Sequence, residues 1–302
     1  MNNIPEHTDL PKQYDVYPFI ELSKFTGKLK GKVVCITGAS SGIGRTTCLA
    51  FAHAGASVAC VARRKDRLDA LVDEIKQKYD TPVAAIPADL FDSKAPKQVI
   101  QSAESALGPI DILINNAGLQ IVRKLVDVTD FEEEWWKLLT INLRAPAALT
   151  HAVLPSMIAR NTGILINIGS TAGAHDIPWC SAYGSSKVAV MKLYQNLGSE
   201  VSQHGITTFN VHPGQIMTDM VIDAFVDAKE RYAAEIPSEG GIQWQTVALA
   251  ANTVLALCAE ERCKALSGRY VDAEQDLEKV LEAVESGRVE RERLYWIKVD
   301  EV

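Results

Sequence analysis

The sequence predicts an α/β fold, a doubly wound parallel sheet of about seven strands with helices on both faces. Short apolar runs of strand length recur along the chain, and segments with helical periodicity separate them. Most residues in these runs are apolar, which is typical of strands buried on both faces. Such strands alternating with helices form parallel sheets, and right-handed crossovers favour a doubly wound sheet over a sandwich. We therefore expect a single domain over residues 31–273.

The expected strands, in chain order, are Val33–Ile36, Ser57–Ala62, Val83–Ile86, Ile110–Ile114, Ile164–Ile168, Thr207–Val211 and Tyr270–Val271. Residues 1–30 carry scattered prolines and aromatic residues, and we interpret them as an arm laid over the core. Residues 274–302 form a C-terminal extension, predicted as a charged helix around Leu277–Val284 followed by an extended segment, Leu294–Val299.

Composition excludes several function classes. The net charge of −7 implies no basic surface for nucleic acid. The six cysteines show no Cys-x-x-Cys spacing, so neither a disulfide nor a metal site is expected. The N-terminus has no basic start or apolar signal core, and the longest apolar stretch, Val247–Cys258, is too short to span a bilayer. We expect a cytoplasmic protein without a membrane partner.

A glycine-rich turn follows the first expected strand and opens the first expected helix. Its residues that would face a ligand are Gly38, Ser40, Ser41, Gly42, Ile43 and Gly44. Glycines at a strand-to-helix turn let the backbone approach a pyrophosphate, which then lies at the helix N-terminus. A turn without a ligand is the alternative. The same letters also match the Gly-x-Ser-x-Gly elbow of hydrolases, but an elbow normally follows several strands and gives Gly44 no role.

Arginines stand where a dinucleotide site would place an acid. Ala62 ends the second expected strand, and Arg63 and Arg64 follow it. Without a carboxylate there is no repulsion of a 2′-phosphate, and arginine can pair with that phosphate bidentately. The pattern favours NADP(H) over NAD(H), the alternative being a solvated basic loop.

Tyr183 and Lys187 lie four positions apart in a segment predicted as helix, so both side chains would project from one face. An ammonium beside a phenol favours the phenolate and lowers a pKa that starts near 10. Ser170, after the fifth expected strand, would bring a hydroxyl to fix a substrate oxygen beside the phenol. Alone, Tyr-x-x-x-Lys is a weak signal.

With these motifs together, the chain resembles a short-chain dehydrogenase/reductase with a Rossmann-type fold, over roughly Lys32 to Ala273. The motifs that carry the resemblance are the glycine turn, Asp89, Asn115-Asn116-Ala117-Gly118, Asn142, Ser170, the Tyr183/Lys187 pair, and Pro213-Gly214-Gln215-Ile216-Met217-Thr218.

The resemblance implies the catalytic roles. Tyr183 would be the acid or base, and Lys187 would bind the nicotinamide ribose and depress the tyrosine pKa. Ser170 would hydrogen-bond the substrate oxygen, and Asn142 would hold a water that links Lys187 to solvent.

It also implies the cofactor contacts. Asp89, with Leu90 beside it, would meet the adenine, and Asn116 the adenosine ribose, while Ala117 and Gly118 allow close approach. Ile216 and Thr218 would hold the nicotinamide carboxamide, in a loop shaped by Pro213 and Gly214.

For the substrate we expect contacts from Gln120, Trp179, Met217 and Met220, although Trp179 would serve equally well as core packing. The segment Asp219–Trp244 is predicted as a mobile lid. Of the adjacent Trp135 and Trp136, only one would face the core, and the other would lie at a subunit interface.

The expected function is therefore NADP(H)-dependent interconversion of a carbonyl and a secondary alcohol on a moderately hydrophobic small molecule, by a homodimer or homotetramer. The arm around Tyr17–Ile20 resembles extensions of fungal family members, some of them in secondary metabolism. Two alternatives stay open: a non-redox reaction (isomerase, dehydratase or cyclase) at the same cofactor site, and a non-catalytic NADP-binding regulatory protein.

Overall fold

The computed structural model describes residues 10–232, 243–292 and 295. Within them, the chain forms a seven-stranded parallel sheet in the order β3-β2-β1-β4-β5-β6-β7. The strands are β1 (Val33–Thr37), β2 (Ser57–Ala62), β3 (Val83–Pro87), β4 (Ile112–Asn115), β5 (Gly163–Ile168), β6 (Ile206–His212) and β7 (Arg269–Asp272). The predicted doubly wound sheet is confirmed, with each strand within two residues of its expected ends.

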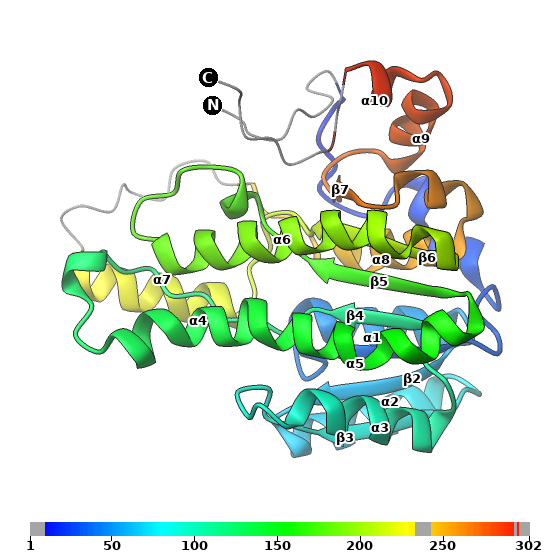
Figure 1. Cartoon of the computed structure of the whole chain (residues 1–302), viewed down its shortest axis with the longest axis horizontal. Coiled ribbons are helices and arrows are strands. Elements are labelled where there is room, and N and C mark those ends of the chain that lie inside the picture. Colours follow the sequence, from blue (N-terminus) through cyan, green and yellow to red (C-terminus); the bar gives the residue numbers. More distant parts are fainter. Residues whose placement is uncertain (1–9, 233–242, 293–294, 296–302) are drawn as a thin grey trace.

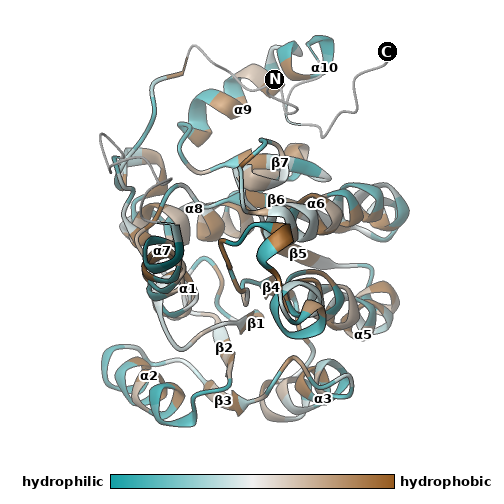
Figure 2. Cartoon of the chain, turned by 90° about the vertical axis from the view of Figure 1, so that its left-hand side faces the viewer, coloured by the Kyte–Doolittle hydropathy of each residue, from teal (hydrophilic) through white to brown (hydrophobic). Residues whose placement is uncertain are grey.

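Helices cover both faces of the sheet, as Figure 2 shows from the end where the strands finish. One layer holds α1 (Gly42–His53), α2 (Lys65–Lys78) and α8 (Val247–Ala259). On the same side of the sheet, α7 (Asp219–Tyr232) lies past the carboxyl ends of the strands (Figure 1 and Figure 2). The other layer holds α3 (Ala95–Leu107), α5 (Ala145–Arg160) and α6 (Ser181–Val201). Near β7 lie the last two helices, α9 (Leu277–Glu285) and α10 (Arg288–Arg291) (Figure 1).

Alternation along β1 shows how the two layers share one sheet. Val34 and Ile36 belong to the core shared with α1 and α8. Val33 and Cys35 belong to the core shared with α3, α5 and α6. Successive side chains of a strand point to opposite faces, so a strand covered on both sides is apolar at most positions rather than at alternate ones.

The N-terminal arm packs against α8 and α9. Ile20 and Phe25 are buried in the main core, and the Tyr17 hydroxyl donates to the carbonyl oxygen of Gln275 and accepts from the Leu277 amide. The expected helix of the extension is present as α9, while the predicted extended segment lies outside the described residues, Tyr295 excepted. The arm and the extension are thus held together at one end of the sheet.

The segment before α5 is not a regular α-helix. α4 (Lys137–Leu139) lies between two π-helical turns, Glu132–Trp136 and Thr140–Arg144. Trp135 packs against the buried cluster that contains Leu138 and Tyr183, whereas Trp136 is 48% exposed, so only one of the two tryptophans faces the core, as predicted. Their rings nevertheless stack on each other, with centroids 6.0 Å apart and an interplanar angle of 22°.

Candidate active site

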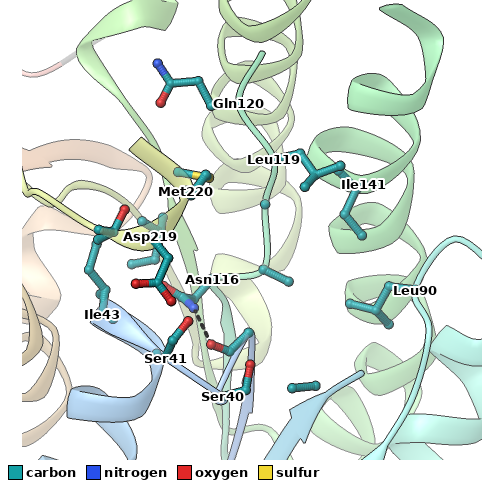
Figure 3. A pocket seen from close by; sticks show the side chains of 18 of the residues that line it. Ser40, Ser41, Ile43, Leu90, Asn116, Leu119, Gln120, Ile141, Asp219 and Met220 are labelled. Atoms are coloured by element: carbon teal, nitrogen blue, oxygen red, sulfur yellow. Dashed lines mark hydrogen bonds between the residues drawn. The ribbon is translucent and has the colours of Figure 1, made fainter. Parts of the chain in front are cut away.

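A cavity of about 360 Å³ lies at the carboxyl ends of the strands. From β1 to β3 the chain adds strands toward one edge of the sheet, and from β4 to β7 it adds them toward the other. Doubly wound sheets leave a crevice where this direction reverses, which here is between β1 and β4. In Figure 3, Ile43, Asp219 and Met220 lie on one side of the cavity and Leu90, Leu119 and Ile141 on the other.

The glycine turn forms one end of this pocket, and all six of its predicted residues line it. Gly38 and Gly42 adopt the left-handed backbone conformation, with φ of 71° and 52°. A Cβ at Gly44 would collide with the carbonyl oxygen of Gly38, which explains the need for a third glycine. The first turn of α1 can therefore pack directly on the loop and point its N-terminus into the pocket.

Asn116 braces the turn from the end of β4. Its Nδ2 donates to the carbonyl oxygen of Thr37 at 2.8 Å, and its backbone N–H donates to Thr37 Oγ1 at 3.0 Å. The N–H of Ala117 donates to the same hydroxyl, also at 3.0 Å. Asn116, Ala117 and Gly118 all line the pocket. Sequence reasoning missed Thr37, whose only signal was a hydroxyl at the last position of a buried strand.

The two arginines after β2 both line the pocket. Arg64 Nη2 donates to Ser40 Oγ at 2.8 Å and to Ser41 Oγ at 3.0 Å, which holds its guanidinium against the glycine turn. The guanidinium of Arg63 lies over the ring of Phe91, 5.9 Å from its centroid. Two cationic groups thus converge beside the turn, from the position where an NAD site would carry an acid.

On the β3 side, Leu90 lines the pocket, whereas Asp89 does not. Asp89 Oδ1 accepts the N–H of Phe91 at 3.1 Å, so this carboxylate shapes the loop that carries Leu90 and Phe91. Phe91 was not predicted as a site residue. It lines the pocket, and its ring lies beneath the guanidinium of Arg63.

Tyr183 and Lys187 share one face of α6 and both line the pocket, as their spacing predicted. Lys187 Nζ lies 5.6 Å from the centroid of the Tyr183 ring and donates to the carbonyl oxygen of Ile168 at 2.8 Å. Burial lowers the pKa of Lys187 to about 8.

The pKa of Tyr183 moves opposite to the expectation. Burial raises it to about 12, and the hydrogen bond with Ser170 acts in the lowering direction without overcoming burial. Both side chains are withdrawn from water, and desolvation penalises the charged form of each. The i, i+4 spacing predicted that the Lys187 ammonium lies near the Tyr183 phenol, but it did not predict that both groups are buried away from water.

Ser170 comes from the end of β5 and is placed beside Tyr183 by that hydrogen bond. It also begins a short 3-10 helix, Thr171–Gly173, where Oγ accepts the N–H of Ala172 at 3.1 Å. Ser170 is not itself among the pocket-lining residues of the described chain. Its hydroxyl is therefore held by a backbone amide, close enough to the phenol to act on the pKa of Tyr183 in the lowering direction.

Asn142 is buried behind the lysine. Its Oδ1 accepts the N–H of Leu119 at 2.8 Å, and its Nδ2 donates to Leu119 O at 2.9 Å and to Ser186 Oγ at 3.0 Å. A Cβ at Gly118 would come within 3.2 Å of Asn142 Oδ1 and 3.9 Å of Lys187 Nζ, so the two groups flank this glycine. Within the described residues, the amide fixes the strand-end loop that carries Leu119 and Gln120.

The loop after β6 reaches the pocket through Pro213 and Thr218. Gly214 has φ of 92°, and Ile216 is buried. The loop is locked to the start of α8: the Gln215 N–H donates to Gln245 Oε1 at 2.7 Å, and the Gln245 N–H donates to Gln215 O at 2.8 Å.

The predicted substrate residues divide. Gln120 and Met220 line the pocket, but Met217 and Trp179 do not, and Met217 is 44% exposed. The ring of Trp179 instead stacks on Tyr232 of α7, with centroids 5.3 Å apart. Asp219 and Asp223, one turn apart on α7, line the pocket and were not predicted. Residues 233–242 of the predicted lid lie outside the described residues.

None of the described helices is long and apolar enough to cross a membrane.

Comparison with known proteins gives consistent results. The family described as short chain dehydrogenase matches residues 32–229. The chain is 40% identical to a short chain dehydrogenase of Pseudocercospora fijiensis, over 97% of each chain. It is 31% identical to the short chain dehydrogenase pigC of Monascus ruber, over 88% of this chain and 86% of that protein.

Solved structures agree with these relatives. A protein assigned as an NAD(P)-dependent gluconate 5-dehydrogenase from Beutenbergia cavernae, with NADP bound at low occupancy, superposes with a TM-score of 0.72 at 29% identity. The match covers 83% of this chain and 97% of that one. A short-chain type dehydrogenase/reductase from Mycobacterium marinum gives a TM-score of 0.71 at 28% identity, with the same coverage.

Proposed function

The chain belongs to the short-chain dehydrogenase/reductase family of oxidoreductases, and on that premise we propose that it is an NADP(H)-dependent carbonyl reductase or alcohol dehydrogenase. Its substrate would be a moderately hydrophobic small molecule, taken up beside Tyr183. The observation that carries the proposal is the convergence of Tyr183, Lys187 and the glycine turn on one pocket, with Ser170 near enough to the phenol to act on its pKa in the lowering direction.

The residues present fit a dinucleotide. The glycine turn offers backbone without side chains at the N-terminus of α1, the arrangement that suits a pyrophosphate. When bound, the cofactor would supply or accept the hydride. The cationic groups of Arg63 and Arg64 would bind the 2′-phosphate, and Asn116 would adjoin the adenosine ribose beside the turn. Leu90 would border the adenine in a loop shaped by Asp89, while Thr218 would border the nicotinamide in a loop that also carries the buried Ile216.

Tyr183 would transfer the proton. Its raised pKa keeps the phenol protonated at neutral pH, which suits a donor to a carbonyl oxygen. The phenolate left after donation would be stabilised by the Ser170 hydrogen bond and by the Lys187 ammonium above the ring. With a pKa of about 8, Lys187 is mostly protonated at pH 7 and can supply the next proton.

The walls of the pocket support an apolar substrate with one polar anchor. Leu119, Ile141 and Met220 provide apolar surface, and the Gln120 amide provides a hydrogen-bonding group. Asp219 and Asp223 place carboxylates on the same pocket, which disfavours strongly anionic substrates.

Turnover with a panel of ketones tests the proposal. We expect purified protein to oxidise NADPH with at least one neutral, moderately hydrophobic ketone or aldehyde. Tight NADPH binding without oxidation across the panel would favour the non-redox reaction or the regulatory role instead.

We further propose a homodimer or homotetramer that acts in the cytoplasm, in secondary metabolism. The exposed rings of Phe131 and Trp136, both stacked on the half-buried Trp135 with centroids 5.0 and 6.0 Å away, form an apolar surface that supports an interface. Sedimentation of the wild type and of Trp136→Glu tests this, because a monomeric wild type would contradict the proposal.

A further inference from the structure

Three chemically related side chains meet behind the loop that follows β6, outside the pocket. His212 is the last residue of β6, Asp272 is the last residue of β7, and Glu274 follows two positions later. The sheet register pairs His212 directly with Asp272. One nitrogen or oxygen atom from each of the three side chains lies within 4.8 Å of the others. The cluster is therefore fixed by the pairing of two neighbouring strands.

All three side chains are buried, with exposures of 3% for His212, 7% for Asp272 and 3% for Glu274. Buried carboxylates normally require partners, and each of these has one oxygen engaged. Asp272 Oδ1 accepts the N–H of Glu274 at 2.8 Å, and Glu274 Oε2 is ion-paired with Lys12. The other oxygen of Glu274, Oε1, lies 4.0 Å from Nε2 of His212.

The imidazole of His212 lacks a hydrogen bond to any part of the chain that the structure describes. Its Nδ1 is buried without a partner, and its Nε2 stands 4.0 Å from Glu274 Oε1, beyond hydrogen-bonding distance. A buried ring nitrogen of this kind is costly unless something binds it. The ring is held in place by Tyr270, whose ring lies parallel to it at 6.4 Å and 8°.

The chemistry of the cluster favours a cation. Two acidic side chains, Asp272 and Glu274, lie beside the imidazole of His212, and the Lys12 ammonium pairs with Glu274. Imidazole nitrogens and carboxylate oxygens are the groups that ligate divalent transition metals in proteins.

We propose that His212, Asp272 and Glu274 bind a divalent transition-metal cation, with Zn²⁺ as the best match. One imidazole and two carboxylates form a donor set that suits zinc, with bonds of about 2.0–2.2 Å. Two ligand atoms on one such ion can be at most about 4.4 Å apart, so the cluster needs only a slight contraction.

The ion would have a structural role, separate from the proposed redox reaction. It would join the ends of β6 and β7 immediately before Pro213 and Gly214. Through the Glu274 carbonyl, which accepts the N–H of Gln13, it would also anchor the N-terminal arm. The three residues form no short metal-binding motif in the sequence, because His212 is far from Asp272 and Glu274 along the chain. The pairing of β6 with β7 brings them together.

Zinc retention on the full-length protein tests the proposal. Protein stripped with a chelator would be dialysed against ZnCl₂, and bound metal measured by elemental analysis. We expect one zinc per chain for the wild type and for His151→Gln, a control that removes an exposed histidine on α5. His212→Gln should weaken zinc binding by about 100-fold or more, and excess MgCl₂ should not compete.

A second variant keeps the proposal testable if His212→Gln folds poorly. Lys12→Met removes the positive charge beside Glu274 and should tighten zinc binding by about tenfold or more. Zinc at a hundredfold excess over its Kd should raise the Tm of the wild type by roughly 5–10 °C. The proposal is overturned if stripped wild type takes up no zinc, if His212→Gln binds it equally well, or if Lys12→Met binds it more weakly.

Discussion

Replacing Arg64 with alanine is expected to weaken NADPH binding far more than NADH binding. Arg64 donates to both serine hydroxyls of the glycine turn, at 2.8 Å to Ser40 and 3.0 Å to Ser41, so its guanidinium is held in place before the cofactor arrives. NADH lacks the 2′-phosphate, so the Arg64→Ala substitution would remove no direct phosphate contact from it, only a nearby positive charge. The difference between the two cofactors therefore isolates the phosphate contact.

The size of the effect follows from one charge-assisted hydrogen bond. Removing such a bond costs about 1.5–3 kcal/mol, which corresponds to roughly 10- to 150-fold in Kd. Both arginines are exposed, so solvent screens the contact and we expect the lower part of that range. Arg63→Ala should show the same preference, because its guanidinium lines the same pocket over Phe91.

The assay is a titration of each variant with NADPH and NADH, followed by cofactor fluorescence. Lys65→Ala is the matched control, because Lys65 adjoins the arginines in sequence but pairs with Asp69 at 2.6 Å and does not line the pocket. Equal losses for the two cofactors, or an NADPH loss in Lys65→Ala as large as in Arg64→Ala, would refute the reasoning.

Three further substitutions probe the turn and the catalytic groups. Gly44→Ala would drive a Cβ into the Gly38 carbonyl oxygen and should lower the unfolding free energy by about 1–3 kcal/mol, measured by urea denaturation, and weaken cofactor binding; unchanged stability would contradict the close packing of α1 on the turn. Lys187→Met should abolish turnover yet raise stability at pH 7. Because burial lowers the folded pKa of Lys187 from 10.5 to about 8, wild-type stability should rise between these pH values while the variant lacks this rise, and parallel urea curves at pH 7 and 10 would argue against it. Ser170→Ala should reduce kcat by about 100-fold or more, and the pH at which Tyr183 ionises should increase, because the lost hydrogen bond lowers that pKa; an unchanged kcat would remove Ser170 from the mechanism.

The sheet was predictable because its signals are local. In a strand such as Ser57–Ala62 every residue after the first is apolar, and only a sheet covered on both faces buries all of them. The glycine turn and the i, i+4 relation of Tyr183 and Lys187 are likewise readable from spacing alone. Their meeting in one pocket then follows from parallel strands that end at the same edge.

Other features depend on contacts between distant segments. The ring of Trp179 is displaced from the pocket because it stacks on Tyr232 of α7, and Met217 is exposed outside the pocket. The raised pKa of Tyr183 results from burial that no local pattern encodes. The pairing of His212 with Asp272, on which the proposed zinc site depends, appears only when β6 and β7 lie side by side. The absence of Cys-x-x-Cys spacing therefore says little about a site of this kind.

The central claim is that Tyr183 passes the proton while NADP(H) passes the hydride, and Tyr183→Phe tests it most directly. The phenyl ring keeps the packing of the buried side chain and removes only the hydroxyl. Single-turnover oxidation of NADPH with an active ketone should slow by about 10²- to 10⁴-fold, the usual contribution of a general acid, while the NADPH Kd stays unchanged. A variant that oxidises NADPH at the wild-type rate would contradict the assignment of Tyr183 as the acid.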